Sequence, residues 1–138
     1  MSDWNTKIIG ELRANGGEIA AGPMAGRTLL ILSSTGARSG QPREAVLTYT
    51  REGHGYVVAG TAGGSPTTPS WVHNLVAHPD AQIEVKGRRI PIRATVVDDE
   101  TRQRLWSMHV AQHPEFAGYP EKTTRVIPII RLEPVAEA

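Results

Sequence analysis

The sequence predicts a mainly β fold, a β-barrel of about six antiparallel strands with three appended helices. Apolar or alternating runs of strand length recur along the chain, and turn-forming residues bound each of them. The 14 glycines and ten prolines are typical of a chain with many turns. Because most connections between the runs are short, antiparallel pairing is favoured, and closure into a barrel removes exposed sheet edges.

Length and composition narrow the class of protein. A chain of 138 residues is expected to form one domain over residues 1–138, with an N-terminal helix within residues 1–17 and a barrel within 27–134. The formal net charge of +1 argues against bulk nucleic-acid binding, and the absence of cysteine excludes disulfides and thiolate chemistry. Neither a secretory signal nor a run of roughly 20 apolar residues is found, so a cytoplasmic protein is expected, with weak peripheral membrane contact left open.

Start and stop signals predict three helices, at residues 3–15, 69–77 and 98–112. The first is amphipathic and ends at Gly16-Gly17. For the second, Thr68 is the expected N-cap and Pro69 the first helical residue. The third begins with the acidic run Asp98-Asp99-Glu100, which suits the positive end of a helix dipole.

Strands are predicted over residues 28–33, 45–50, 56–59, 81–86, 89–97 and 126–132. The second and third are expected to form a hairpin, because a tight glycine-containing connection joins them. Alternation in the fifth strand places Val96 inward. Pro128 lies within the last strand and indicates an edge or a bulge there, since proline donates no ladder hydrogen bond.

Two glycine-rich loops are candidate anion sites. The first, residues 33–42, contains Thr35, Ser39 and nearby backbone N–H groups, and Arg38 and Arg43 add guanidinium forks that suit phosphate or carboxylate oxygens. The second, residues 60–68, leads directly into a helix N-terminus, where backbone N–H groups point outward. The alternative interpretations are a hairpin loop with solvated arginines and an ordinary loop with a good helix cap.

Side chains for protein-based catalysis are scarce. His109 and His113 could share a helix face, but Val110 stands where a zinc-protease glutamate would be and no third metal ligand is suggested. The serines lack a nucleophile-elbow motif. Abundant anion-binding loops with few catalytic side chains suit a protein whose cofactor carries the chemistry.

Taken jointly, five segments resemble the deazaflavin-dependent nitroreductase family over roughly residues 27–134. They are Thr35 to Arg43, Gly60 to Gly64, Pro69 to Leu75, His78-Pro79 and Arg125 to Ile129. The resemblance implies a split β-barrel like that of flavin-mononucleotide-binding proteins, with the deazaflavin coenzyme F420 as hydride carrier. It further implies an oxidoreductase that acts on an electron-poor small molecule such as a quinone, a nitroaromatic or an enone.

The resemblance also implies which residues form the site. It assigns the coenzyme's phosphate and acidic tail to Ala37, Arg38, Ser39 and Arg43. It places Glu44, Ala45, Val46, Leu47 and Thr48 beneath the coenzyme. It places Ala59, Gly60, Thr61 and Ala62 against the ring and phosphate, followed by Gly63 and Gly64. It completes the pocket with Ser70, Trp71, Val72, His73 and Asn74, and sets Phe116 and Tyr119 on the substrate side, with Tyr119 or a water as proton donor.

The chain departs from the family pattern at three positions. Many relatives have proline at Val46, lysine at Ala62 and tyrosine at Phe116. These differences bear on nitroimidazole reduction more than on coenzyme binding. Two alternative functions stay open: a flavin-mononucleotide oxidoreductase on the same barrel, and a non-catalytic F420-binding or storage protein. The protein is expected to be a monomer or a homodimer.

Overall fold

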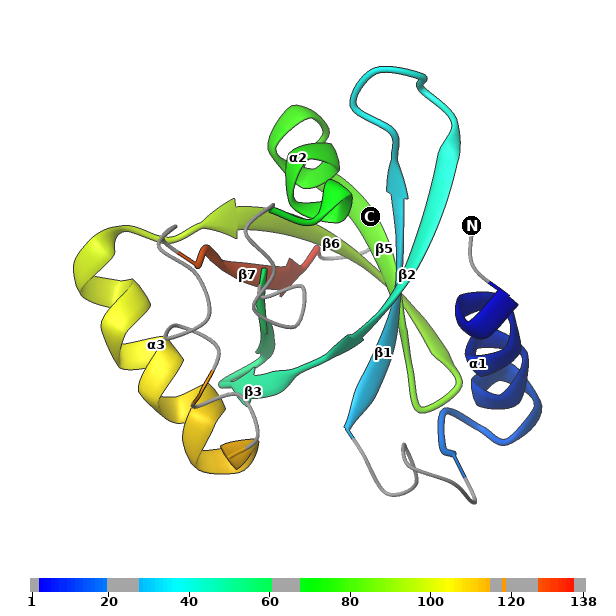
Figure 1. The fold of residues 1–138 in the computed structure, drawn as a ribbon, viewed down its shortest axis with the longest axis horizontal. Helices are drawn as coiled ribbons and strands as arrows, with labels where there is room; N and C mark the ends of the chain where they lie inside the picture. Colours follow the sequence, from blue (N-terminus) through cyan, green and yellow to red (C-terminus); the bar gives the residue numbers. More distant parts are fainter. Residues whose placement is uncertain (1–2, 20–27, 61–67, 115–117, 119–126, 136–138) are drawn as a thin grey trace.

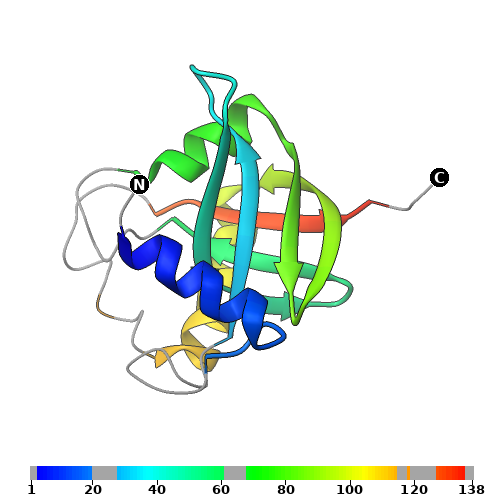
Figure 2. The same ribbon diagram turned by 90° about the vertical axis from the view of Figure 1, so that its right-hand side faces the viewer.

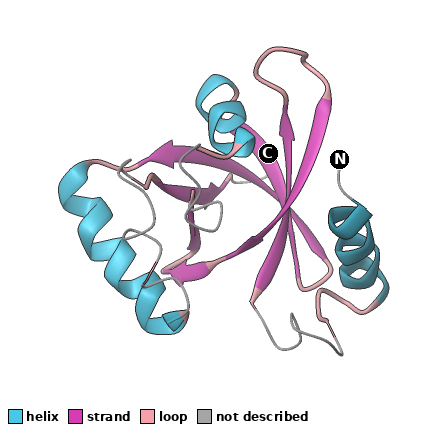
Figure 3. Ribbon diagram, in the orientation of Figure 1, coloured by secondary structure: helices cyan, strands magenta, loops and turns pink. Residues whose placement is uncertain are grey.

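The computed structural model describes residues 3–19, 28–60, 68–114, 118 and 127–135, with side chains described from Thr6 onward. Its elements are α1 (Asp3–Ala14), β1 (Leu29–Thr35), β2 (Pro42–Thr48), β3 (Thr50–Glu52), β4 (Gly55–Ala59), α2 (Ser70–Ala77), β5 (Asp80–Val85), β6 (Arg88–Val96), α3 (Asp99–Gln112) and β7 (Ile129–Pro134). The predicted mainly β class with three helices is confirmed (Figure 3).

One curled antiparallel sheet organises these elements, in the order β2-β1-β5-β6-β7-β4-β3. It has seven strands where six were expected, because the predicted second strand changes partner at Tyr49. Up to Thr48 the chain pairs with β1, and from Thr50 it pairs with β4 as the predicted hairpin. The three helices lie on different sides of the sheet (Figure 1). The fold is therefore the expected split barrel with appended helices.

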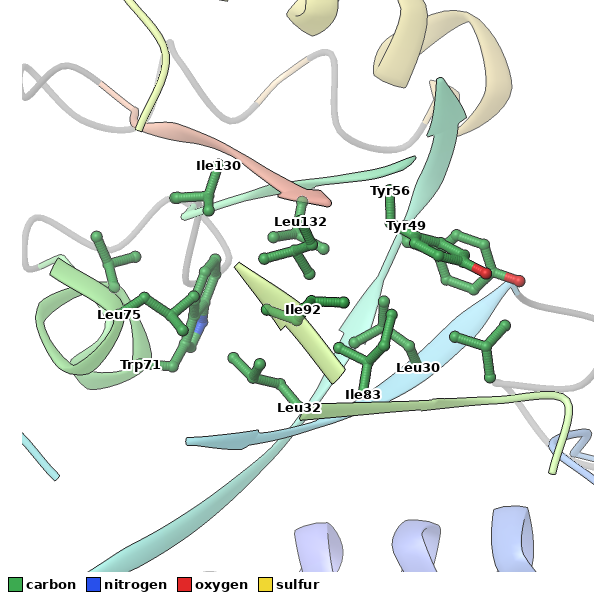
Figure 4. Packing of buried hydrophobic residues seen from close by; sticks show 13 residues of the cluster. Leu30, Leu32, Tyr49, Tyr56, Trp71, Leu75, Ile83, Ile92, Ile130 and Leu132 are labelled. Carbon is green, nitrogen blue, oxygen red and sulfur yellow. The ribbon is translucent and has the colours of Figure 1, made fainter. Parts of the chain in front are cut away.

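The main core fills the inside of the curled sheet. Alternate residues of β1, such as Leu30 and Leu32, are fully buried there with Ile83 of β5 and Ile130 of β7. Figure 4 shows these strand side chains together with Trp71 and Leu75, which α2 contributes. Each large apolar side chain buried in this way stabilises the fold by about 1.5–3 kcal/mol relative to an exposed one.

Two smaller cores attach the other helices to the outer faces of the sheet. Ile8, Ile9 and Leu12 of α1 pack against the residues of β1 that point outward, Leu29 and Ile31. Figure 2 shows α1 lying across β1 and β2. Leu105 of α3 packs on β4 and β7 in the third core. Successive side chains of β1 point to opposite faces of the sheet, and both faces are buried. This explains why β1 is a continuous apolar run.

α1 ends where the sequence predicted, and the glycine pair also makes a tight contact. Gly16 and Gly17 have φ values of +63° and +90°, which favour glycine. A Cβ on Gly17 would lie 2.4 Å from Cα of Lys86 in the β5–β6 turn. Only a residue without a side chain allows the end of α1 to approach this turn so closely.

Three local expectations are wrong. α2 begins at Ser70 with Pro69 at the N-cap, and no side chain caps it, so Thr68 does not have the expected role. Val96 is 47% exposed, because it ends β6 beyond the main core. Pro128 precedes β7, which is an interior strand between β6 and β4. Because Pro128 lies before the first ladder pair of β7, Ala59 with Ile129, its missing N–H removes no hydrogen bond from that ladder, and its carbonyl accepts one from Gly60 N–H.

No helix among the described residues is long and apolar enough to cross a bilayer.

Candidate functional site

A pocket of about 750 Å³ lies at one end of the sheet, between the β1–β2 loop, the start of β2 and the N-terminal half of α2. Figure 1 shows this loop and α2 extending from the same end of the molecule. The residues that line the pocket are Ser34, Gly36, Ala37, Arg38, Ser39, Arg43, Glu44, Ala45, Ser70, Trp71, His73 and Asn74. Two segments that are separate in the sequence, the first glycine loop and the middle helix, therefore form one site.

The β1–β2 loop holds its own shape. Gly36 N–H donates to the carbonyl of Gln41 at 2.8 Å, and Gly40, with a φ of +70°, donates back to the carbonyl of Gly36 at 3.0 Å. The hydroxyl of Ser39 accepts hydrogen bonds from Gln41 N–H and from the Arg43 guanidinium. A Cβ on Gly36 would lie 2.5 Å from this hydroxyl oxygen. The loop is thus preorganised, with Arg43 fixed at its base.

A single hydrogen bond connects the loop to α2. Ala37 N–H donates to Oδ1 of the buried Asn74 at 2.9 Å. Because Gly36, Ala37, Gly40 and Gln41 use their N–H groups within the protein, they are not the anion donors that the glycine pattern suggested. The groups at this pocket that suit an anion are therefore the two arginine side chains and the backbone N–H groups in the first turn of α2.

Arg38 and Arg43 are exposed and both line the pocket. Among the described residues neither guanidinium forms an ion pair with a carboxylate. Ser70 and Trp71 place the uncapped N-terminus of α2 at the same pocket. Two guanidinium forks without a described carboxylate partner, beside a helix N-terminus, form a region suited to phosphate or carboxylate groups.

The pocket also has an apolar wall. Trp71 is 9% exposed, packs on the main core and lines the pocket, next to Ala45 of β2. Figure 4 shows the indole held against the core side chains that surround it. Since packing on the main core restrains the indole, Trp71 offers a rigid apolar surface at the pocket. The site therefore joins a cationic half to an apolar half.

The structure brings ten of the expected site residues to this pocket: Ala37, Arg38, Ser39, Arg43, Glu44, Ala45, Ser70, Trp71, His73 and Asn74. Val46, Leu47, Thr48, Ala59, Gly60 and Val72 do not line it. Val46 packs on the α1 core and Leu47 on the main core. A Cβ on Gly60 would lie 2.9 Å from both Val72 and Pro128, so Gly60 permits close packing there. Thr61, Ala62, Gly63, Gly64, Phe116 and Tyr119 lie outside the described residues.

Sequence reasoning missed Ser34 as a lining residue. It is a buried polar residue near the end of β1, opposite Arg43 in the β1–β2 ladder. A serine that continues the inward positions of Leu30 and Leu32 is the signal that could have identified it, because a polar residue on a core face needs a partner. The ladder register, which the sequence does not specify, determines that it lies beside Arg43.

His109 and His113 have structural contacts. A hydrogen bond of 2.9 Å joins Nδ1 of the buried His109 to the hydroxyl of Thr50. His113 Nε2–H donates to the carbonyl of Tyr49 at 2.8 Å. Both contacts attach α3 to the junction between β2 and β3. Within the described part of the chain no group of three metal-binding side chains is found.

Comparisons with known proteins identify relatives of the chain. The family model described as F420H(2)-dependent quinone reductase matches residues 6–134. The F420H(2)-dependent quinone reductase Rv1261c of Mycobacterium tuberculosis is 38% identical over 106 residues, which cover 75% of this chain and 71% of that protein. A putative F420H(2)-dependent quinone reductase of the same organism, Rv3178, is 33% identical over 76% of this chain and 88% of its own length.

Solved structures agree on the fold. The F420-H2 dependent reductase FDR-A superposes with a TM-score of 0.71 at 31% identity, covering 78% of this chain and 95% of that one. A putative pyridoxamine 5'-phosphate oxidase from Listeria innocua superposes with a TM-score of 0.55 at 12% identity over 97% of this chain and 95% of its own, and this likeness concerns the fold alone.

Proposed function

We propose that the pocket between the β1–β2 loop and α2 binds the anionic tail of coenzyme F420, on the premise that the chain belongs to the F420H(2)-dependent quinone reductase family and is an F420-dependent oxidoreductase. The observation that carries this assignment is a pair of guanidinium groups, Arg38 and Arg43, that have no carboxylate partner among the described residues and line a pocket with an aromatic wall. The coenzyme's tail is a phosphodiester followed by glutamates, so it requires the cations that this pocket provides.

The described residues fit such a ligand on both halves. Arg38 and Arg43 offer planar forks for phosphate and carboxylate oxygens, and the N-terminus of α2 adds backbone donors and a partial positive charge. Trp71 and Ala45 offer an apolar surface against which a flat ring packs. Asn74 keeps the loop and α2 at a fixed separation through its bond to Ala37. The site is therefore built before the ligand arrives, which reduces the ordering cost of binding.

When bound, reduced F420 supplies a hydride for the two-electron reduction of a quinone-type acceptor. The chain's own residues position and shield the reactants, because hydride transfer requires close stacking and exclusion of water. We assign the acceptor side to Phe116 and Tyr119, and the proton to Tyr119 or a water. The protein nucleophile that would characterise a covalent mechanism is not required.

The experiment is turnover of purified protein with reduced F420 and menadione, followed by the return of oxidised-F420 absorbance. We expect menadione-dependent oxidation, with no activity when reduced flavin mononucleotide replaces F420. F420 binding without turnover would indicate the storage alternative, and turnover with the flavin would indicate the flavin alternative. In the same assay, unchanged turnover by Tyr119→Phe would eliminate its hydroxyl as proton donor.

The proposal also covers the domain organisation, oligomeric state and cellular location of the protein. We further propose that residues 1–138 form one domain, and the packing of α1, α2 and α3 on the same sheet supports this. A monomer or a homodimer in the cytoplasm fits this arrangement, and a solved structure titled as a domain-swapped dimer superposes with a TM-score of 0.72 at 29% identity over 93% of each chain. Light scattering during size-exclusion chromatography measures the oligomeric state, and co-sedimentation with anionic vesicles measures peripheral membrane contact.

A further inference from the structure

An ion cluster connects the last turn of α1 to the sheet beside the pocket. The Arg13 guanidinium contacts Glu44 of β2 at 2.5 Å and Glu84 of β5 at 2.7 Å. β1 lies between those two strands, with Ser33 opposite Glu44 and Ile31 opposite Glu84. One side chain from α1 therefore bridges two strands, β2 and β5, across the strand that lies between them.

Glu44 occupies an unusual place for a carboxylate. Among the described residues that line the pocket it is the one acidic residue, and it lies next to Arg43. Side chains alternate along a strand, so Glu44 points to the α1 face with Val46, whereas Arg43 and Ala45 point to the opposite face. The pocket thus has a negative charge at its margin, and Arg13 holds that charge on the far side of the strand.

The charges of this cluster are coupled. Hydrogen bonds from Arg13 hold the pKa of Glu84 below its ordinary value, and the two carboxylates raise the pKa of Arg13 above its own. Without the guanidinium, Glu44 and Glu84 would lose the positive charge that they share across β1. A ligand with a phosphodiester and glutamates would then bind beside a more negative margin at the edge strand β2.

We propose that Arg13 is a positioning residue that raises the pocket's affinity for an anionic coenzyme by neutralising Glu44 and holding its carboxylate on the α1 face. The inference rests on the proposed function, since it assumes that the tail of F420 binds at Arg38 and Arg43. It gives α1 a role beyond packing on β1, because its last turn sets the electrostatic potential at the margin of the pocket.

The test is a double-mutant cycle measured by fluorescence titration with F420. Arg13→Gln should weaken F420 binding about fivefold at low salt, the order of effect expected for one exposed charge near an anion site. Arg13→Lys, which keeps the charge, should stay within about twofold of the wild type. In a Glu44→Gln background, Arg13→Gln should change affinity by less than about twofold, since the two substitutions act through one interaction.

Glu84→Gln is the matched control, because Glu84 shares the guanidinium and does not line the pocket. Combined with Arg13→Gln, it should leave the fivefold loss in place. A loss that persists equally in the Glu44→Gln background would overturn the proposal and indicate a packing role for Arg13. Thermal melts of every variant identify any that fail to fold, and Arg13→Lys still decides the charge dependence if Arg13→Gln is among them.

Failure of this inference and failure of the proposed function give different results. If F420 binds the wild type and Arg38→Ala weakens it while Arg13→Gln does not, the proposed site stands and the role of Arg13 is rejected. If Arg38→Ala leaves F420 affinity unchanged, the proposed site itself is wrong.

Discussion

The arginines at the pocket and those at the contact between α3, β7 and β3 differ in their partners. Arg104 of α3 and Arg131 of β7 both contact Glu52 of β3, at 3.0 Å and 2.7 Å. Arg38 and Arg43, at the other end of the sheet, form no ion pair with a described carboxylate. The guanidinium groups of Arg104 and Arg131 connect α3 and β7 to β3, while those of Arg38 and Arg43 line the pocket without a described carboxylate partner. The comparison separates arginines that connect elements of the fold from those that we assign to the coenzyme.

The largest expected effect is a loss of folding stability when the core between α3 and the sheet is altered. Leu105 is fully buried in the core beneath α3, so Leu105→Ala should lower the free energy of unfolding by about 2–5 kcal/mol. Urea denaturation measures the loss, and F420 affinity of the folded protein should be unchanged. Leu105→Met, which nearly conserves volume, should cost less than about 1.5 kcal/mol. An equal loss of F420 affinity in both variants would contradict the separation of the two regions.

A substitution at the pocket should instead change the affinity for F420. Charge-assisted contacts contribute roughly 1.5–3 kcal/mol each, so Arg43→Ala should weaken F420 about tenfold or more. The thermal midpoint should barely change, because Arg43 has no carboxylate partner to lose among the described residues. Arg104→Ala is the matched control, as it removes an arginine that contacts Glu52. Similar F420 affinities for the two variants, measured by fluorescence titration, would reject the assignment of Arg43 to the tail.

The smallest expected effect concerns pH. Hydrogen bonds from Arg131 and then Arg104 hold the pKa of Glu52 below its usual 4.5. The carboxylate therefore stabilises the fold above pH 4.5, and this contribution disappears as pH falls through the lower pKa of the folded state. Glu52→Gln should cost about 1 kcal/mol or less at pH 7.

Chemical denaturation of wild type and Glu52→Gln at several pH values checks this expectation. The difference between the two proteins should shrink at the acid end of the series. A constant difference from pH 7 to pH 3 would show that Glu52 contributes through packing and not through its charge. F420 affinity at pH 7 should be equal in the two proteins, because this ion-pair network lies away from the pocket residues.

Local chemistry allowed much of the site to be predicted from the sequence. The apolar run before a polar loop with two glycines predicted β1 and its turn, and the proline-led pattern predicted α2 within a residue of its start. Arg38, Arg43 and Trp71 were expected at the site because their side chains suit anions and flat rings, and all three line the pocket. Predictions of this kind hold because backbone preferences and side-chain chemistry belong to residues close together in the chain.

The tertiary structure decided the relations between distant residues. Strand order places β5 beside β1, and this alone allows Arg13 to reach Glu84, 71 positions along the chain. The ladder register places Ser34 opposite Arg43, and the change of partner at Tyr49 divides one expected strand into β2 and β3. Pro128 is compatible with the interior strand β7 because it precedes the first ladder pair of that strand. By itself the sequence determined which elements form and which side chains can bind an anion. The tertiary structure alone decided which elements and side chains lie next to one another. Packing and pairing energies depend on contacts between residues that are far apart in the sequence.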